Sequence, residues 1–214
     1  MTIHNDFPLI PQIPSRPTGE ADHRIANNLA AISGLVRVRA RAANDVTDPQ
    51  TFLLEIADRI ETVATLHRLL ARSDSGSVRL SHYLEEICER LSSAVATVAP
   101  SYSVICSPDQ IVPSNIALPL GLITAELFSN SLKYAHPAGL PAKISVSYRR
   151  TPLDEIMIVY EDDGVGFPEE FDASHDGHLG MRFIRLLTEQ LGGTHKWLSG
   201  PLGVQFEMRC PCGK

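Results

Sequence analysis

Hydrophobic residues begin to recur at helical spacing within residues 20–44. Members of the first apolar stripe are four, three and four residues apart, as one face of a helix requires: Ile25, Leu29, Ile32 and Val36. The following segment NDVTDPQ, residues 44–50, interrupts this stripe, and its Asp48 and Pro49 suit the N-cap and first turn of a new helix. The pattern therefore predicts two consecutive amphipathic helices.

The second helix carries a longer stripe of the same kind. Its members follow alternating steps of three and four residues: Leu53, Ile56, Ile60, Val63, His67 and Leu70. Two such helices joined by a short break form an antiparallel hairpin. Because a single hairpin cannot bury both stripes, we expect residues 20–73 of two copies to associate into a four-helix bundle, which would make the protein a homodimer.

After the polar linker RSDSGS, short apolar or alternating runs are separated by helical runs. A strand and a helix are expected within 78–95, and further helices within the apolar run 114–135 and the glycine-terminated run 179–193. The other expected strands are 101–107, 143–150, 155–162, 193–198 and 203–210. This order predicts an α/β sandwich over residues 78–212 and an α+β class for the whole chain, with proline-rich residues 1–19 as a flexible lead-in.

Composition narrows the function classes. Acidic residues outnumber basic ones, 25 against 19, and the formal net charge of −6 argues against a nucleic-acid-binding body. No segment approaches the roughly 20 apolar residues that span a membrane, and the first residues lack the features of a secretory signal. We therefore expect a cytoplasmic protein that binds neither nucleic acid nor membrane.

The segment EDDGVGFP, residues 161–168, follows an apolar strand and is the first candidate site. Asp162 ends the strand, and Gly164 and Gly166 permit a tight turn that holds its carboxylate at the edge of the sheet. A buried carboxylate in this position can accept a hydrogen bond from the exocyclic amine of a purine. By itself the pattern also fits an ordinary Asp-Gly turn.

A second set of polar residues lies in the long helix expected at 114–135. Glu126, Asn130 and Lys133 are four and three residues apart and therefore share one face. Magnesium prefers oxygen ligands and keeps several waters, so Asn130 suits a single direct ligand to an ion that bridges phosphates. A solvated polar face would show the same spacing.

The third candidate segment is DGHLGMRFIRLL, residues 176–187, in which Gly177 and Gly180 lead into a helix. Glycines at a helix N-terminus expose backbone N–H groups to an anion, here the phosphates of a nucleotide. The Gly-Lys-Ser/Thr of a Walker loop is absent from this segment, so a P-loop ATPase is excluded there.

In this order and spacing the three segments resemble the N, G1 and G2 boxes of the Bergerat-fold ATPases, a group that includes histidine kinases, gyrase, Hsp90 and MutL. The resemblance covers residues 78–212 and implies ATP and Mg²⁺ as cofactors. By it, Asn130 would hold magnesium, Asp162 would bind the adenine amine, and Glu126 and Lys133 would serve the phosphates. The pocket would be shaped by four glycines: Gly164, Gly166, Gly177 and Gly180. Val204 stands where many relatives carry a threonine beside the aspartate, and the lid between Gly166 and Gly177 is short.

The segment DHRIANNLAAISGLV, residues 22–36, resembles the dimerisation and phosphoacceptor segment of HisKA_2 sensor histidine kinases. The related HWE class fits less well, because Ala125 stands where its N box has a histidine and Trp197 lies outside a Trp-x-Glu motif. The resemblance implies that His23 accepts the phosphoryl group, that Asn27 orients water for phosphatase activity, and that Arg24 contacts phosphate or a receiver domain.

The function that follows is a two-component histidine kinase that phosphorylates a histidine from ATP and passes the phosphoryl group to a response-regulator aspartate. Residues 1–19 are too few to form a sensor, so a separate sensor protein could supply the signal. Two alternatives stay open at this point. One is a histidine phosphotransfer protein that uses little or no ATP, and the other is an ATP-dependent switch or an anti-sigma-type serine kinase.

Overall fold

The computed structural model describes residues 33, 49–71, 76–94, 99–173 and 179–212. The predicted lead-in at 1–19 and the first hairpin helix, apart from residue 33, lie outside these residues. The helices of the described part are α2 (Pro49–Ala71), α3 (Leu80–Ser93), α4 (Ser114–Tyr134) and α5 (Leu179–Gln190). Its strands are β1 (Ser77–Arg79), β2 (Ser101–Ile105), β3 (Ile111–Pro113), β4 (Lys143–Arg150), β5 (Glu155–Asp162), β6 (Thr194–Gly200) and β7 (Gly203–Pro211).

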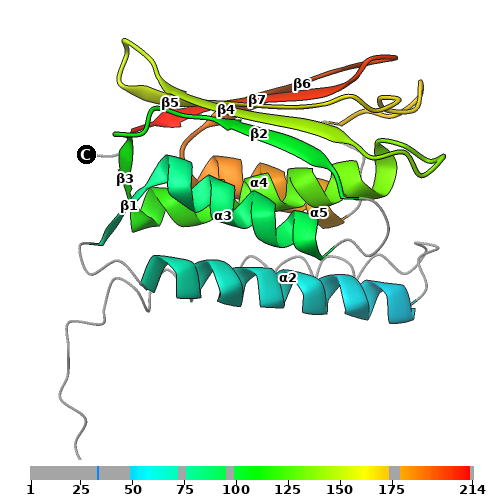
Figure 1. The fold of residues 1–214 in the computed structure, drawn as a ribbon, viewed down its shortest axis with the longest axis horizontal. Helices are drawn as coiled ribbons and strands as arrows, with labels where there is room; N and C mark the ends of the chain where they lie inside the picture. The colour runs from blue at the N-terminus through cyan, green and yellow to red at the C-terminus, as the bar shows by residue number, and fades with distance from the viewer. Residues whose placement is uncertain (1–32, 34–48, 72–75, 95–98, 174–178, 213–214) are drawn as a thin grey trace, which may run out of the picture.

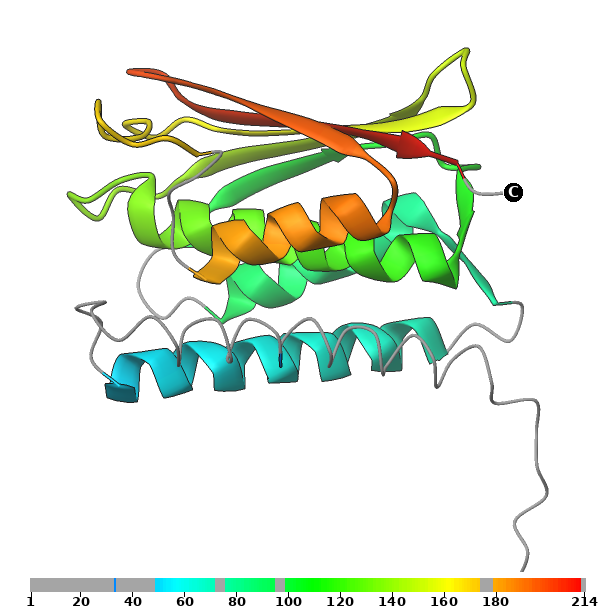
Figure 2. The same cartoon turned by 180° about the vertical axis from the view of Figure 1, so that it is seen from behind.

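The elements form three layers (Figures 1 and 2). A five-stranded sheet with the order β2-β4-β5-β7-β6 forms one layer, and α3, α4 and α5 cover one of its faces. Helix α2 lies along the far side of these three helices, away from the sheet, and contacts α4. The described part therefore confirms the predicted α+β class, with a sheet and helix sandwich joined to a helix of the predicted hairpin.

Both kinds of strand pairing occur in the main sheet. Strand β2 is parallel to β4, whereas the pairs β4–β5, β5–β7 and β7–β6 are antiparallel. Every second residue of β4 is buried against the helices, which is the alternation expected of a sheet with one covered face: Ile144, Val146 and Tyr148. Strand β3, which pairs with β1 in a separate two-stranded sheet, was not predicted because three residues show no periodicity.

Helix α4 lies at the centre of the molecule and is buried along most of its length. It packs between α3, α5 and α2, and the largest fully buried side chains of the core include Phe128 on α4 together with Tyr160 and Phe206 on the sheet. Pro119, expected near the first turn, lies inside the helix after its first turn. A helix surrounded on so many sides provides a rigid base for polar residues on its surface.

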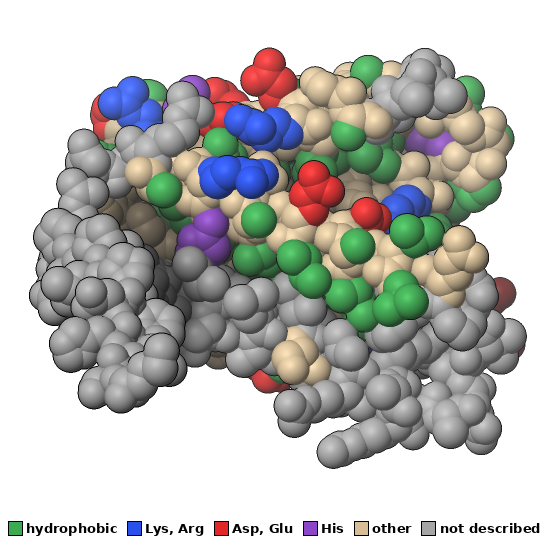
Figure 3. Space-filling model, turned by 90° about the horizontal axis from the view of Figure 1, so that it is seen from below, with side chains coloured by type: hydrophobic (Ala, Val, Ile, Leu, Met, Phe, Trp, Pro, Cys, Tyr) green, Lys and Arg blue, Asp and Glu red, His purple; other side chains and the backbone are tan. Residues whose placement is uncertain are grey.

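Some residues of the apolar stripe of α2 are buried, whereas others are exposed. Two members of the stripe, Val63 and Leu70, are buried on the helix that contacts α4, and so is the neighbouring Leu66. Leu53 and Ile60 are exposed, as is Leu54 beside them, and Figure 3 shows hydrophobic side chains on this side of the molecule next to residues that are not described. Part of the stripe predicted to face a partner therefore packs against the sandwich instead. In the described part, none of the helices is long and apolar enough to cross a membrane.

Candidate functional site

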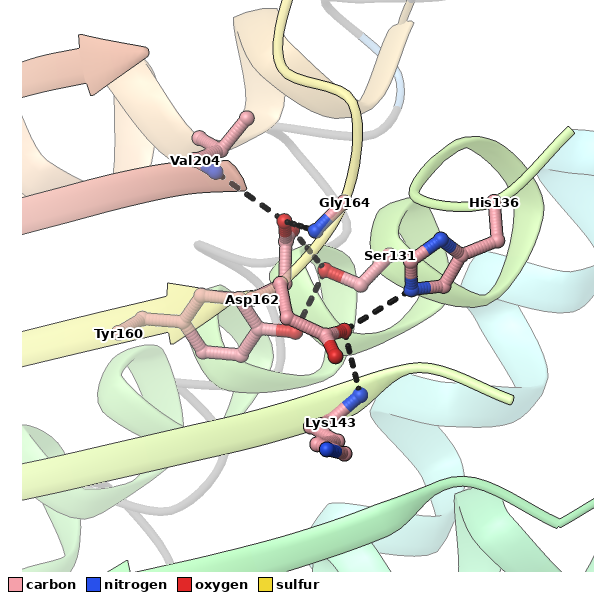
Figure 4. A network of polar contacts seen from close by, with 8 residues as sticks. Ser131, His136, Lys143, Tyr160, Asp162, Gly164 and Val204 are labelled. Atoms are coloured by element: carbon pink, nitrogen blue, oxygen red, sulfur yellow. Dashed lines mark hydrogen bonds and ion pairs between the residues drawn. The ribbon is translucent and has the colours of Figure 1, made fainter. Parts of the chain in front are cut away.

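The carboxylate of Asp162 is held at the end of β5 by three donors (Figure 4). Its Oδ1 accepts the backbone N–H of Gly164 at 3.0 Å and that of Val204 at 3.1 Å. Its Oδ2 accepts the hydroxyl of Ser131 at 2.6 Å, and that hydroxyl in turn accepts the Tyr160 hydroxyl at 2.8 Å. The three donors to the carboxylate come from α4, β7 and the turn after β5, and Tyr160 on β5 supports the Ser131 donor.

This network leaves acceptor capacity at the carboxylate. Each carboxylate oxygen can accept two hydrogen bonds, and Oδ2 of Asp162 uses one of them for Ser131. Burial raises the pKa of Tyr160 well above its usual value, so its hydroxyl stays protonated and acts as a donor to Ser131. The remaining lone pair of the oriented carboxylate can accept from an amine, which is the chemistry that adenine recognition requires.

Val204 supplies a donor to Asp162 although it lacks the hydroxyl of the threonine found in many relatives. The side chain has no hydroxyl, but its backbone N–H donates directly to Asp162. The neighbouring Gly203 makes this approach possible, because it has a φ of 123° and a Cβ at this position would overlap the carbonyl oxygen of Asp162. Ser131, Tyr160 and Gly203 were missed from the sequence, where nothing distinguishes them from ordinary core and turn residues.

We expect Gly203→Ala to destabilise the domain by about 2 kcal/mol or more, because the new methyl group must displace the backbone of Asp162 in a conformation that alanine disfavours. Thermal unfolding followed by circular dichroism measures the effect. Gly200→Ala is the matched control in the same hairpin, since a Cβ there would meet no atom within 4 Å. Equal melting temperatures for the two variants would contradict the close approach that we describe.

A cavity of about 400 Å³ opens beside the Asp162 carboxylate. This volume lies within the usual range for small-molecule sites. An aromatic cluster forms part of its wall: Phe167 lies 4.9 Å from Phe171 and 5.6 Å from Trp197, measured between ring centroids. This cluster was not predicted, because its members are distant in sequence and come from the loop after β5 and from β6.

Two of the predicted glycines, Gly164 and Gly180, lie at opposite ends of the site. A Cβ at Gly164 would lie 2.6 Å from Cα of Ala135, and one at Gly180 would lie 2.6 Å from Oε2 of Glu126. The turn after β5 and the start of α5 therefore contact α4 at points nine residues apart, which is about 13 Å along a helix. This span is comparable with an extended nucleoside triphosphate. Gly166 lines the same cavity.

Glu126 is buried and paired with a residue that was not predicted. Arg59 on α2 donates from Nη2 to Oε2 of Glu126 at 3.1 Å, and its Nε lies 3.0 Å from Oε1. Burial raises the pKa of Glu126, and the Arg59 guanidinium opposes this rise. Arg59 could not be found from the sequence, because the two residues are 67 positions apart.

Asn130 and Lys133 both line the cavity, one turn and two turns of α4 beyond Glu126. Among the described residues, the side chain of Asn130 makes one weak contact, from Nδ2 to the sulfur of Met181 at 4.0 Å. Its amide oxygen is thus available to a hydrated cation, and Lys133 is exposed enough to reach an anion. In the described part of the chain, no three His, Cys, Asp or Glu side chains are grouped to hold a metal ion, so a cation here would depend on Asn130, water and phosphates.

The structure therefore places five of the predicted residues on the wall of one cavity: Asn130, Lys133, Asp162, Gly166 and Gly180. Gly164 and Glu126 do not line it, but Gly164 donates to Asp162 and Glu126 lies beside Gly180. The remaining predicted residues lie outside the described part: His23, Arg24, Asn27 and Gly177. The site as described can bind an adenine-like base at Asp162 and an anion or hydrated cation near the start of α5.

Comparisons with known proteins agree with this geometry. A family model described as histidine kinase, HisKA_2, matches residues 20–95. A second model, HATPase_c, described as histidine kinase-, DNA gyrase B- and HSP90-like ATPase, matches residues 115–214. The two models thus match the segment around the predicted phosphoacceptor and the sandwich that contains the cavity.

Curated relatives and solved structures point the same way. The chain is 26% identical over 200 residues to sensor histidine kinase PdtaS of Mycobacterium tuberculosis, covering 91% of this chain and 39% of that protein. It is 25% identical over 202 residues to blue-light-activated histidine kinase 2 of Erythrobacter litoralis, covering 92% of this chain and 57% of that protein. The chain therefore spans less than two thirds of these relatives. The structure of the EL346 blue-light-activated histidine kinase from Erythrobacter litoralis has the same fold, with a TM-score of 0.73 at 22% identity over 92% of this chain and 59% of that one.

Proposed function

Because the chain belongs to the HisKA_2 class of histidine kinases and carries their HATPase_c domain, we propose that it transfers the γ-phosphoryl group of ATP to its own His23 and then to an aspartate of a response-regulator receiver domain. The family's ATPase domain implies the use of ATP. The observation that carries the proposal is the oriented carboxylate of Asp162 beside a cavity of suitable size. Phosphatase activity toward the receiver is a further part of this proposal.

In the proposed complex the adenine amine donates to Asp162, and the aromatic cluster of Phe167, Phe171 and Trp197 lies along the apolar wall of the cavity. The triphosphate extends along α4 toward the start of α5, where Gly180 leaves room and the helix N-terminus offers N–H groups. Gly177 would extend this anion site. This direction follows from the positions of the two turns that contact α4.

The cation proposed for this site is Mg²⁺, held by the amide oxygen of Asn130. When bound, magnesium neutralises the charge that develops on the transferring phosphoryl group. Lys133 binds a phosphate oxygen, and Glu126 lies at the same end of the site, within 2.6 Å of a Cβ placed at Gly180. All three side chains come from one face of a largely buried helix, so their relative positions are fixed.

The acceptor in this proposal is the neutral imidazole of His23, whose lone pair attacks the γ-phosphorus. The bond between nitrogen and phosphorus forms as the bond from the γ-phosphorus to the bridging oxygen breaks, and ADP leaves. Glu126 would take the proton released from the imidazole. Asn27, four residues after His23 in the sequence, would orient water for hydrolysis of the phosphorylated receiver, and Arg24 would contact phosphate or the receiver.

A homodimer is also proposed, supported by Leu53, Leu54 and Ile60, which are exposed on α2. Two copies of the hairpin would bury these side chains in a four-helix bundle. The protein would encounter ATP and its receiver partner in the cytoplasm. A separate sensor protein could act through the same hairpin.

Incubation of the purified chain with Mg²⁺ and ATP labelled at the γ-position tests the proposed function. We expect a phosphate label that acid removes and base preserves, as nitrogen-linked phosphate does, measured by filter binding after each treatment. An acid-stable label would instead identify a serine kinase. A chain that binds no nucleotide but takes phosphate from a phosphorylated receiver would be a phosphotransfer protein, which would contradict the proposal.

A further inference from the structure

Arg59 connects α2 with the phosphate end of the cavity. Its side chain is only 12% exposed, and it lines the cavity together with Asn130 and Gly180. The guanidinium is held by two groups: Nε and Nη2 contact Glu126, and Nη1 donates to the backbone carbonyl of Glu55 at 2.9 Å. An arginine from the hairpin segment is thus fixed at a site otherwise built by the sandwich.

The position of this guanidinium relative to the start of α5 is specific. A Cβ placed on Gly180 would lie 2.6 Å from Oε2 of Glu126, 3.1 Å from Nη2 of Arg59 and 3.6 Å from Oδ1 of Asn130. The guanidinium, the catalytic carboxylate, the amide oxygen and the helix start therefore face one small volume. The Asp162 carboxylate contacts α4 at Ser131, which is five residues from Glu126, about 7.5 Å along the helix. The volume beside Gly180 therefore lies at the end of the site away from the base, where the phosphates farthest from the base would lie.

Because of the negative charges around this volume, a third phosphate could bind there only with Arg59 present. Two carboxylates, Glu126 and Glu55, lie beside the guanidinium, with the Glu55 carboxylate 3.9 Å from Nη1. Without Arg59, no guanidinium would neutralise the buried carboxylate of Glu126. A terminal phosphate would then lie close to this negative charge, and the two anions would repel each other strongly at low dielectric. Nη2 carries a second N–H beyond the one donated to Glu126, so it can bind a phosphate oxygen without giving up that contact.

We propose that Arg59 is the residue that recognises the terminal phosphate of the nucleotide, so that the chain distinguishes ATP from ADP through a residue of α2. The inference rests on the nucleotide-binding part of the proposed function. It also makes the docking of α2 and the binding of ATP mutually dependent. Whatever favours the contact between Arg59 and Glu126 raises the affinity for ATP, and ATP in turn favours the docked position of α2.

The test compares the binding of ADP with that of a non-hydrolysable β,γ-imido analogue of ATP, each with Mg²⁺, by isothermal titration calorimetry of the full chain. We expect Arg59→Ala to weaken binding of the ATP analogue by about tenfold or more, as for loss of a charge-assisted hydrogen bond, and to change ADP binding little. Arg68→Ala is the matched control, because Arg68 lies on the same helix and contacts Thr65 on the surface.

Removing Arg59 also leaves Glu126 without its partner, so Arg59→Gln serves as a second variant that keeps hydrogen-bonding capacity but loses the charge. Melting temperatures of both variants identify any loss of folding, and Arg59→Gln is expected to show the same selective loss. An equal loss for both ligands, or no loss for either, would overturn the inference. A wild-type chain that binds both nucleotides but forms no phosphohistidine would overturn only the proposed kinase activity.

Discussion

Asp162→Asn is expected to reduce ATP affinity by at least about a hundredfold, because the site loses the acceptor that the base requires. In the wild type, Gly164, Val204 and Ser131 all donate to this side chain, and both carboxylate oxygens accept. An asparagine amide replaces one acceptor oxygen with an NH₂ group, which repels either these donors or the amine of adenine. The loss should appear as an absence of binding at ATP concentrations that saturate the wild type.

The neighbouring Asp163 provides a matched control for this experiment. Its carboxylate accepts the backbone N–H of Lys143 at 2.8 Å and pairs with Nε2 of His136 at 2.9 Å. It does not line the cavity, so Asp163→Asn should bind ATP nearly as well as the wild type. Calorimetric titration of the three proteins, with circular dichroism to verify folding, measures the difference. Retained affinity in Asp162→Asn would show that the base binds elsewhere.

His23→Gln is expected to abolish the acid-labile phosphate label completely while leaving ATP affinity at the wild-type level. Glutamine is similar in size and polarity to histidine but has no nucleophilic nitrogen at neutral pH, so only the acceptor is removed. Asp162 and the cavity are separate from this residue in sequence and should bind ATP as before. The combination of normal binding with no label distinguishes a missing acceptor from a damaged ATP site.

His82→Gln is the corresponding control, since His82 is exposed on α3 and is not part of the cavity. Its label should equal that of the wild type in amount and in sensitivity to acid. If His23→Gln kept the full label, the acceptor would have to be sought among the other histidines, and the assignment of the phosphoacceptor segment would be wrong.

The regular elements were predictable because their signals are local. The alternation in KISVSYRR and the helical spacing in LGMRFIRLL appear within a few residues, and β4 and α5 occupy these segments. The turn at Asp162 was recognisable for the same reason, since its glycines follow directly in sequence. Strand β3 shows the limit of this approach, because its three residues are extended only through their pairing with β1.

The contacts that complete the site were not predictable, because they join residues that are distant in sequence. Arg59 reaches Glu126 across 67 positions, and Val204 reaches Asp162 across 42. A single sequence carries no record of such pairings, and Val204, in place of the threonine of many relatives, gives no indication that its backbone supplies a donor. The backbone N–H that supplies the missing donor does not depend on the side chain and is therefore invisible to motif analysis.

The contact between β7 and Asp162 has a consequence for the order in which the domain matures during synthesis. The N–H of Val204 belongs to β7, the last strand of the described chain, and β7 pairs with residues 155–161 of β5. A nascent chain that has emerged only as far as α5 already contains Asp162, Asn130 and Gly180, but its aspartate lacks one of its donors and β5 has an open edge. We therefore expect ATP to stabilise the finished domain more than a chain that ends at α5, in which the open edge of β5 is also free to pair with another strand.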